Sequence, residues 1–207
     1  MFKKIFSALC LATVILLAAN QAEAYGAPKI ILIVDSPTWT FSDPEKAYVE
    51  VEESLEKIFG ETHPYKLVPR EETEAYVQIY REEHDLITST EAEEGKDIET
   101  YLKKKDFYNI CTYFDSDYII YARVTNTSPQ NSEGFATKSK KTNVVLDFRV
   151  WSNAKKDFPY YKRVTSKGSS TAFLRGSASA SRALKKGLRK GLREVEKDAS
   201  KILAAMQ

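Results

Sequence analysis

Basic side chains recur at helical spacing near the carboxyl end of this 207-residue chain. They form two neighbouring rows: Arg182, Lys185, Lys186, Arg189, Lys190, Arg193 and Lys197. Ammonium and guanidinium groups arranged in this way can contact anionic lipid, an anionic glycan polymer or an acidic protein partner. The same pattern is also found on the solvated side of an ordinary amphipathic helix. The sequence therefore gives two interpretations of these residues, a partner-binding surface and a solvated helix face.

The opposite side of the same predicted helix is apolar. The helix is predicted to begin near Ser177 and to run almost to the end, with one apolar line of Leu184, Leu188, Leu192, Val195, Ala199, Ile202, Leu203 and Met206. Gly187 and Gly191 lie one turn apart and permit close approach to a sheet or a second helix, although each glycine costs about 1 kcal/mol of helix propensity. We therefore favour a core-packing helix with a solvated basic face.

Residues for catalysis or metal binding are few. His63 and His84 are not in a metal-ligand spacing, and no nucleophile elbow, phosphate-binding glycine loop or calcium loop is found. Cys111 follows Phe107 and Ile110 on one helical face, which predicts a buried and inert thiol. We expect no catalytic residue, no metal and no cofactor. A triad or a carboxylate-only ion site assembled from distant positions stays open.

The first residues have the pattern of a secretory signal peptide. Lys3 and Lys4 precede an apolar run over residues 5–19, which is shorter than the ~20 residues of a membrane span, and Ala22-Glu23-Ala24 supplies small residues for cleavage before Tyr25. We expect residues 1–24 to be removed and residues 25–207 to form a single globular envelope domain. The protein is then exported and soluble, in the periplasm or outside the cell, so nucleic acid is not an expected partner.

Charge is distributed unevenly along the chain. Residues 43–106 contain 19 acidic and 9 basic residues, whereas residues 118–207 contain 19 basic and 6 acidic residues. Such asymmetry can steer a charged partner, and it can also be neutralised when the two halves pack against each other.

Hydrophobic periodicity predicts an α/β fold with the order β-α-β-α-α-β-β-β-α and a mixed sheet of roughly five strands packed by helices. A long carboxyl-terminal helix completes it. The predicted strands are residues 29–35, 65–68, 118–125, 144–151 and 160–166, and the predicted helices are residues 42–60, 71–87, 98–114 and 177 onward. Residues 126–141 are predicted to be a polar loop.

The turn Asp115-Ser116-Asp117-Tyr118 and its surrounding elements resemble a bacterial envelope family. That family includes the TolB amino-terminal domain, the curli-secretion lipoprotein CsgG and lipoprotein activators of penicillin-binding proteins. Its turn usually reads Gly-Ala-Asp before an aromatic or apolar strand; here Asp117 matches and Asp115 replaces the glycine. The resemblance implies a non-enzymatic periplasmic binding or assembly module, and no catalytic residue is transferred with it.

The function expected from the sequence is an exported, non-enzymatic binding or assembly factor of the bacterial cell envelope. The expected partner is another envelope protein. The alternative is a peripheral membrane or anionic-polymer binder that acts through the basic carboxyl-terminal helix. A hydrolase is the third possibility.

Overall fold

A mixed six-stranded sheet forms the centre of the part of the chain that the computed structural model describes, residues 26–36, 44–84, 86, 102–127, 130–133, 137–173 and 178–207. The strands are β1 (Lys29–Asp35), β2 (Lys66–Leu67), β3 (Tyr118–Asn126), β4 (Gln130–Glu133), β5 (Thr137–Ser152) and β6 (Asp157–Phe173). The helices are α2 (Pro44–Phe59), α3 (Arg70–Glu83), α4 (Lys104–Tyr113), α5 (Ala180–Glu196) and α6 (Ala199–Ala205).

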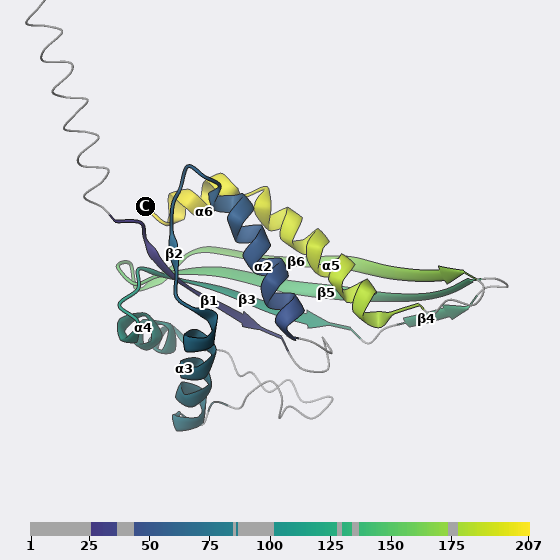
Figure 1. Ribbon diagram of the computed structural model, residues 1–207, viewed down its shortest axis with the longest axis horizontal. Helices are drawn as coiled ribbons and strands as arrows, with labels where there is room; N and C mark the ends of the chain where they lie inside the picture. The colour runs from purple at the N-terminus through teal and green to yellow at the C-terminus, as the bar shows by residue number, and fades with distance from the viewer. Residues whose placement is uncertain are drawn as a thin grey trace, which may run out of the picture.

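Parallel and antiparallel strands occupy different parts of this sheet (Figure 1). β1 pairs in parallel with β2 on one side and with β3 on the other. β5 pairs antiparallel with β3, β4 and β6. The predicted α/β class and mixed sheet are confirmed, with six strands in place of roughly five.

The additional strand corrects the predicted loop at residues 126–141. β4 lies within it, and β5 begins at Thr137, seven residues earlier than the alternating pattern from Val144 predicts. β6 is longer in the same way, because Thr137–Asn143 pairs with Lys167–Phe173. Main-chain hydrogen bonds hold this part of the sheet, so its polar side chains give no apolar alternation for sequence analysis to detect.

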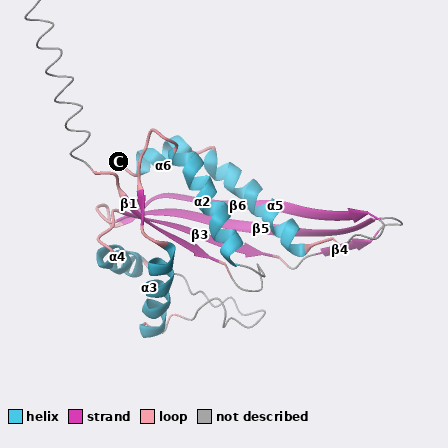
Figure 2. Cartoon of the chain, in the orientation of Figure 1, coloured by secondary structure: helices cyan, strands magenta, loops and turns pink. Residues whose placement is uncertain are grey.

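Helices cover both faces of the sheet (Figure 2). On one face α2, α5 and α6 pack on the apolar side chains of β1, β3, β5 and β6. On the other face α3 and α4 pack on a second cluster that includes Ile31, Tyr121 and Trp151. The sheet is therefore the middle layer, as an α/β fold requires.

Helix α2 agrees with its predicted apolar stripe. Tyr48, Val51, Leu55 and Ile58 are all buried. Gly60 follows the helix with a φ of 57°, a conformation that glycine adopts without steric cost. Residues 42 and 43, with which the predicted helix begins, lie outside the described residues.

The predicted long carboxyl-terminal helix is two helices in the structure, α5 and α6, with a break at Lys197 and Asp198. The Asp198 carboxylate accepts hydrogen bonds from Lys162 at 2.7 Å, Lys201 at 3.0 Å and Tyr160 at 3.2 Å. The hydrogen bond from Lys162, followed by that from Lys201, lowers the pKa of Asp198 to about 2. These bonds hold the break against β6, whereas the predicted apolar residues of both helices, such as Leu188 and Ile202, are buried.

The turn between α4 and β3 contains Asp115, at the position where the resembled family usually has glycine. Asp115 has a φ of 47°, and the Asp117 carboxylate accepts a 2.7 Å hydrogen bond from the backbone N–H of Lys29 at the start of β1. Cys111 is buried as predicted, and burial raises the pKa of its thiol to about 11. Both features stabilise the fold and leave the Cys111 thiol out of contact with solvent.

The predicted signal peptide, with its cleavage site near Tyr25, lies outside the described residues. Among the helices of the described part, none combines the length and the apolar character that a membrane crossing needs.

Candidate functional site

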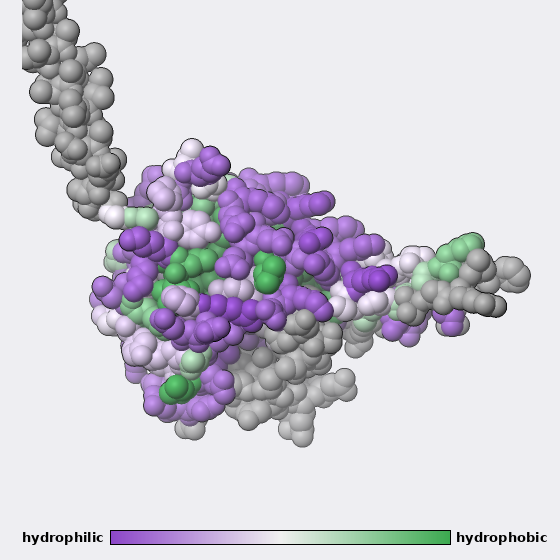
Figure 3. Space-filling model, viewed as in Figure 1, coloured by the Kyte–Doolittle hydropathy of each residue, from purple (hydrophilic) through white to green (hydrophobic). Residues whose placement is uncertain are grey.

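Positive charge is concentrated where β5, β6 and α5 extend away from the rest of the sheet. Residues 137–143, 167–173 and 180–190 together contain nine basic residues and no acidic residue. These segments are packed together, because β5 pairs with β6 and α5 contacts both strands. Figure 3 shows hydrophilic side chains over the outer surfaces of α2 and α5. We call this part of the molecule the basic end.

One basic row of α5 faces α2. Arg189 makes two hydrogen bonds to the Glu50 carboxylate, at 2.5 and 2.9 Å, and Lys185 lies 2.7 Å from the same carboxylate. The Glu50 side chain is only 4% exposed. Burial alone would raise the pKa of Glu50, but the hydrogen bonds from Arg189 and Lys185 outweigh it and lower that pKa. Two of the seven predicted partner-binding residues therefore form a helix–helix contact within the fold.

The second row of α5 lies on the flank next to β6. Lys190 donates a 3.0 Å hydrogen bond to the main-chain oxygen of Lys167, and Arg182 and Lys186 are in the same helical row. Lys186 and Arg182 are an exposed pair of cations, four residues apart. This row is available to a partner, unlike the row that contacts Glu50.

The other two predicted residues lie further along α5. Arg193 is exposed and lines a cavity of about 210 Å³ between α2 and α5. Lys197 is exposed and lies 2.7 Å from Glu194, an i,i+3 pair on the surface. The seven residues thus divide among three surroundings and do not form one continuous surface.

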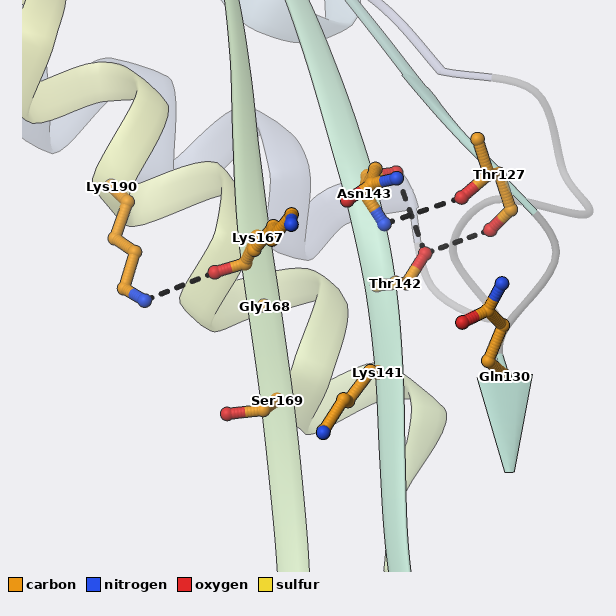
Figure 4. A pocket seen from close by; sticks show the side chains of 9 residues that line it. All are labelled: Thr127, Gln130, Lys141, Thr142, Asn143, Lys167, Gly168, Ser169 and Lys190. Carbon is orange, nitrogen blue, oxygen red and sulfur yellow. Dashed lines mark hydrogen bonds between the residues drawn. The ribbon is translucent and has the colours of Figure 1, made fainter. Parts of the chain in front are cut away.

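A groove of about 560 Å³ adjoins the second row (Figure 4). Four elements and one connecting residue contribute to it: Thr127, Gln130, Lys141, Thr142, Asn143, Lys167, Gly168, Ser169 and Lys190. Three of these are lysines and none is a carboxylate. The Thr142 hydroxyl donates a 2.8 Å hydrogen bond to the main-chain oxygen of Thr127. The Thr127 N–H donates a 3.0 Å hydrogen bond to the Asn143 carbonyl.

This set of groups can bind negative charge without doing chemistry. Ammonium, amide and hydroxyl groups donate hydrogen bonds to phosphate, sulfate or carboxylate oxygens, and charge-assisted hydrogen bonds are the stronger ones. Lys141 and Lys167 were not among the predicted residues. The only signal in the sequence was the basic stretch Lys138-Ser-Lys-Lys141, which lay in a predicted loop.

A buried polar cluster lies on the opposite face of the sheet. The Asp35 carboxylate accepts hydrogen bonds from Tyr121 at 2.9 Å and Arg81 at 3.2 Å. Burial, and then the Asp35 charge, raise the pKa of Tyr121 well above its ordinary value, so the phenol stays a hydrogen-bond donor. His84 stacks on Tyr80, and in the described residues no three His, Cys, Asp or Glu side chains are grouped to hold a metal ion. These contacts connect α3 to the sheet.

Replacement of Arg189 by Glu is expected to lower the free energy of unfolding by about 1–3 kcal/mol, because buried Glu50 then loses two hydrogen bonds and faces a second carboxylate. Lys197→Glu is the matched control, since an exposed i,i+3 pair contributes about 0–1 kcal/mol. Urea unfolding at low salt measures both. Equal, small effects would mean that Arg189 is solvated and that the contact with Glu50 contributes little.

No protein-family model matches the chain, and no curated protein does. Solved structures similar to it include a lipoprotein from Neisseria meningitidis (12% identity, 86% of this chain and 98% of that chain, TM-score 0.37). A hypothetical protein from Chlamydia trachomatis is 8% identical, with 84% of this chain and 98% of that chain covered and a TM-score of 0.42. A minor lipoprotein from Acinetobacter baumannii is 8% identical, with 84% of this chain and 93% of that chain covered and a TM-score of 0.38. Likenesses of this size do not assign a family, and the resemblance to TolB and CsgG stays a prediction.

Proposed function

We propose that this chain is an exported, non-enzymatic binding or assembly factor of the bacterial cell envelope, and that its basic end is where it contacts an anionic partner. The observation that carries the proposal is the groove at this end, which is lined by Lys141, Lys167 and Lys190 and by no carboxylate. The signal-peptide pattern of the first residues supports the envelope as the compartment.

The charges of the basic end are not neutralised equally. Lys185 and Arg189 contact Glu50, so these two cations serve the fold. The described residues include no carboxylate in an ion pair with Lys141 or Lys167. A partner that supplies negative charge would therefore meet cations whose attraction is not already satisfied, and salt would weaken the interaction.

The groove has no arrangement that would activate a nucleophile. Its hydroxyls belong to Thr127, Thr142 and Ser169, and the lining contains no histidine or carboxylate that could act as a general base. Thr142 donates its hydroxyl hydrogen bond to a main-chain oxygen of Thr127. Binding is therefore the function that these residues support, in preference to hydrolysis.

The test is a double charge reversal, Lys141→Glu with Lys167→Glu. Its matched control is Lys66→Glu with Lys105→Glu, which changes the net charge equally at exposed positions on β2 and α4. Poly-L-glutamate, vesicles containing phosphatidylglycerol and peptidoglycan sacculi represent protein, lipid and cell-wall partners. At low salt we expect the groove variant to bind at least one of these probes about tenfold more weakly, a change of about 1.4 kcal/mol, with the control within about twofold.

The probe that shows this difference identifies the partner class. Equal loss in the groove variant and the control would mean that only net charge matters. Failure of the unmodified protein to bind any of the three probes would contradict an anionic partner. Both results would remove the basic end as the binding surface.

A further inference from the structure

The outer edge of β6 is a long row of main-chain groups at the side of the sheet. β6 has 17 residues and, within the described part of the chain, pairs with β5 alone. Natural sheets usually shorten, cover or bend such edges, because an open edge is a template for another strand. An edge of this length in β6 therefore requires an explanation.

Hydrogen bonds at Asn143 show which residues of β6 face outward. The N–H of Asn143 donates to Thr127 Oγ1 at 3.3 Å, and its carbonyl accepts from the Thr127 N–H at 3.0 Å. Both groups of Asn143 therefore point away from β6, so its register partner Lys167 does not exchange hydrogen bonds with it. The main-chain groups of Lys167 point outward, in agreement with the hydrogen bond that its carbonyl accepts from Lys190.

The same parity extends along the regular part of the ladder. Successive strand residues alternate in direction, and the register from Tyr161 to Phe173 is continuous. The residues with outward main-chain groups are therefore 161, 163, 165, 167, 169, 171 and 173. Apart from the Lys167 carbonyl, these groups are unpaired in the hydrogen bonds found among the described residues.

We propose that this edge binds an extended, acidic segment of a partner protein, which adds to the sheet as a further strand beside β6. The proposal rests on the proposed function and names its partner: a polypeptide whose main chain supplies the hydrogen bonds and whose side chains supply the negative charge. Charge selects this occupant, because β6 has no acidic residue after Asp157 and its Lys167 is in no ion pair found among the described residues, whereas Lys162 and Arg163 pair with Asp198 and Asp147.

Neighbouring side chains favour carboxylates at alternate positions of the added strand. α5 covers one face of β6, and its flank beside the edge contains Arg182, Lys186 and Lys190. Side chains of an added strand alternate between the two faces, so every second one would lie next to these cations. A second copy of β6 would place basic residues against basic residues, which is unfavourable.

The experiment uses a capped nine-residue peptide in which glutamate alternates with valine and threonine, and a counterpart in which lysine replaces glutamate. Hydrogen exchange of individual amides is followed by nuclear magnetic resonance. We expect the acidic peptide to slow exchange at residues 163, 165, 167, 169 and 171 by about tenfold or more, with little change at the even-numbered amides already bonded to β5. The lysine peptide should have no effect.

Thr165→Pro removes one outward N–H without touching the ladder to β5, since proline is tolerated on an edge where its nitrogen faces solvent. We expect this variant to bind the acidic peptide at least tenfold more weakly, whereas Thr165→Val, which retains the N–H, should bind within about threefold of the unmodified chain. Should Thr165→Pro not fold, an acidic peptide N-methylated on alternate residues provides the same test on the unmodified protein. It should lose binding only when the methyl groups are on the edge that faces β6.

Three results would overturn the proposal: unchanged exchange at the odd-numbered amides, equal binding of the lysine peptide, or protection of those amides in the free protein that increases with its concentration. The last result would assign the edge to a second copy. If the peptide fails while phosphatidylglycerol vesicles or sacculi still bind through Lys141 and Lys167, the strand-docking inference is wrong and the anionic-partner function stands.

Discussion

Leu188→Ala is expected to lower the free energy of unfolding by about 2–5 kcal/mol, the range for removing a buried leucine from a packed core. Leu188 is fully buried in the cluster that α5 forms with α2 and the sheet. Movement of α5 cannot fill the cavity that the substitution leaves, because at Gly187 and Gly168 the helix already lies in close contact with the strands. Urea unfolding monitored by circular dichroism measures the change.

Lys186→Ala is the control for this prediction. Lys186 is exposed on the same helix, and alanine is a good helix former, so the change should stay within about 0.5 kcal/mol. If Leu188→Ala unfolds like the unmodified protein and instead loses vesicle binding, the apolar side of α5 contacts a membrane and not a core.

Gly168→Ala should destabilise the protein by about 3 kcal/mol, at the upper end of the range for overpacked sites. A Cβ at this position would lie 1.8 Å from the main-chain oxygen of Ala183 and 2.8 Å from the backbone nitrogen of Gly187. Main-chain atoms cannot rotate away as a side chain does, so α5 must move from β6. Thermal and urea unfolding give the size of the effect.

Gly191→Ala is expected to act in the opposite direction. Its Cβ would lie 3.6 Å from Leu146, an ordinary contact distance, and alanine gains up to about 1 kcal/mol of helix propensity over glycine. A variant of Gly168 that is as stable as the variant of Gly191 would contradict the close approach of α5 to β6. The two glycines of α5 therefore differ. A side chain at Gly187 would collide with Val144, so glycine is needed there, whereas Gly191 can be replaced by alanine.

Hydrophobic periodicity predicted the helices and strands whose apolar side chains are buried in the core. The apolar positions of α2, β1 and α5 repeat at 3.6 residues or form a continuous run, and each segment folds as its pattern indicates. Ile79 is an exception, because it follows Tyr76 at helical spacing in α3 but is exposed to solvent. Val77 and Tyr80 are the buried apolar residues that pack α3, so the helix forms although one apolar residue faces solvent.

The candidate site was less predictable, because its residues are joined by pairing between distant segments. Glu50 and Arg189 are 139 residues apart, and no spacing in the sequence connects them. Lys141 and Lys167 come together only when β5 and β6 extend beyond the apolar alternation that starts at Val144. The basic helix is recognisable from the sequence, whereas the two strands that form the groove with it are not.

The most direct test of an anionic partner at the basic end is a map of amide chemical shifts during titration with the probe that binds. The account predicts that the largest shifts occur in Lys141–Asn143, Lys167–Ser169 and the neighbouring turn of α5 around Lys190, and that 0.5 M salt removes them, since the Debye length is then only about 4 Å. Shifts concentrated on α3 and α4, or shifts that persist in high salt, would contradict it.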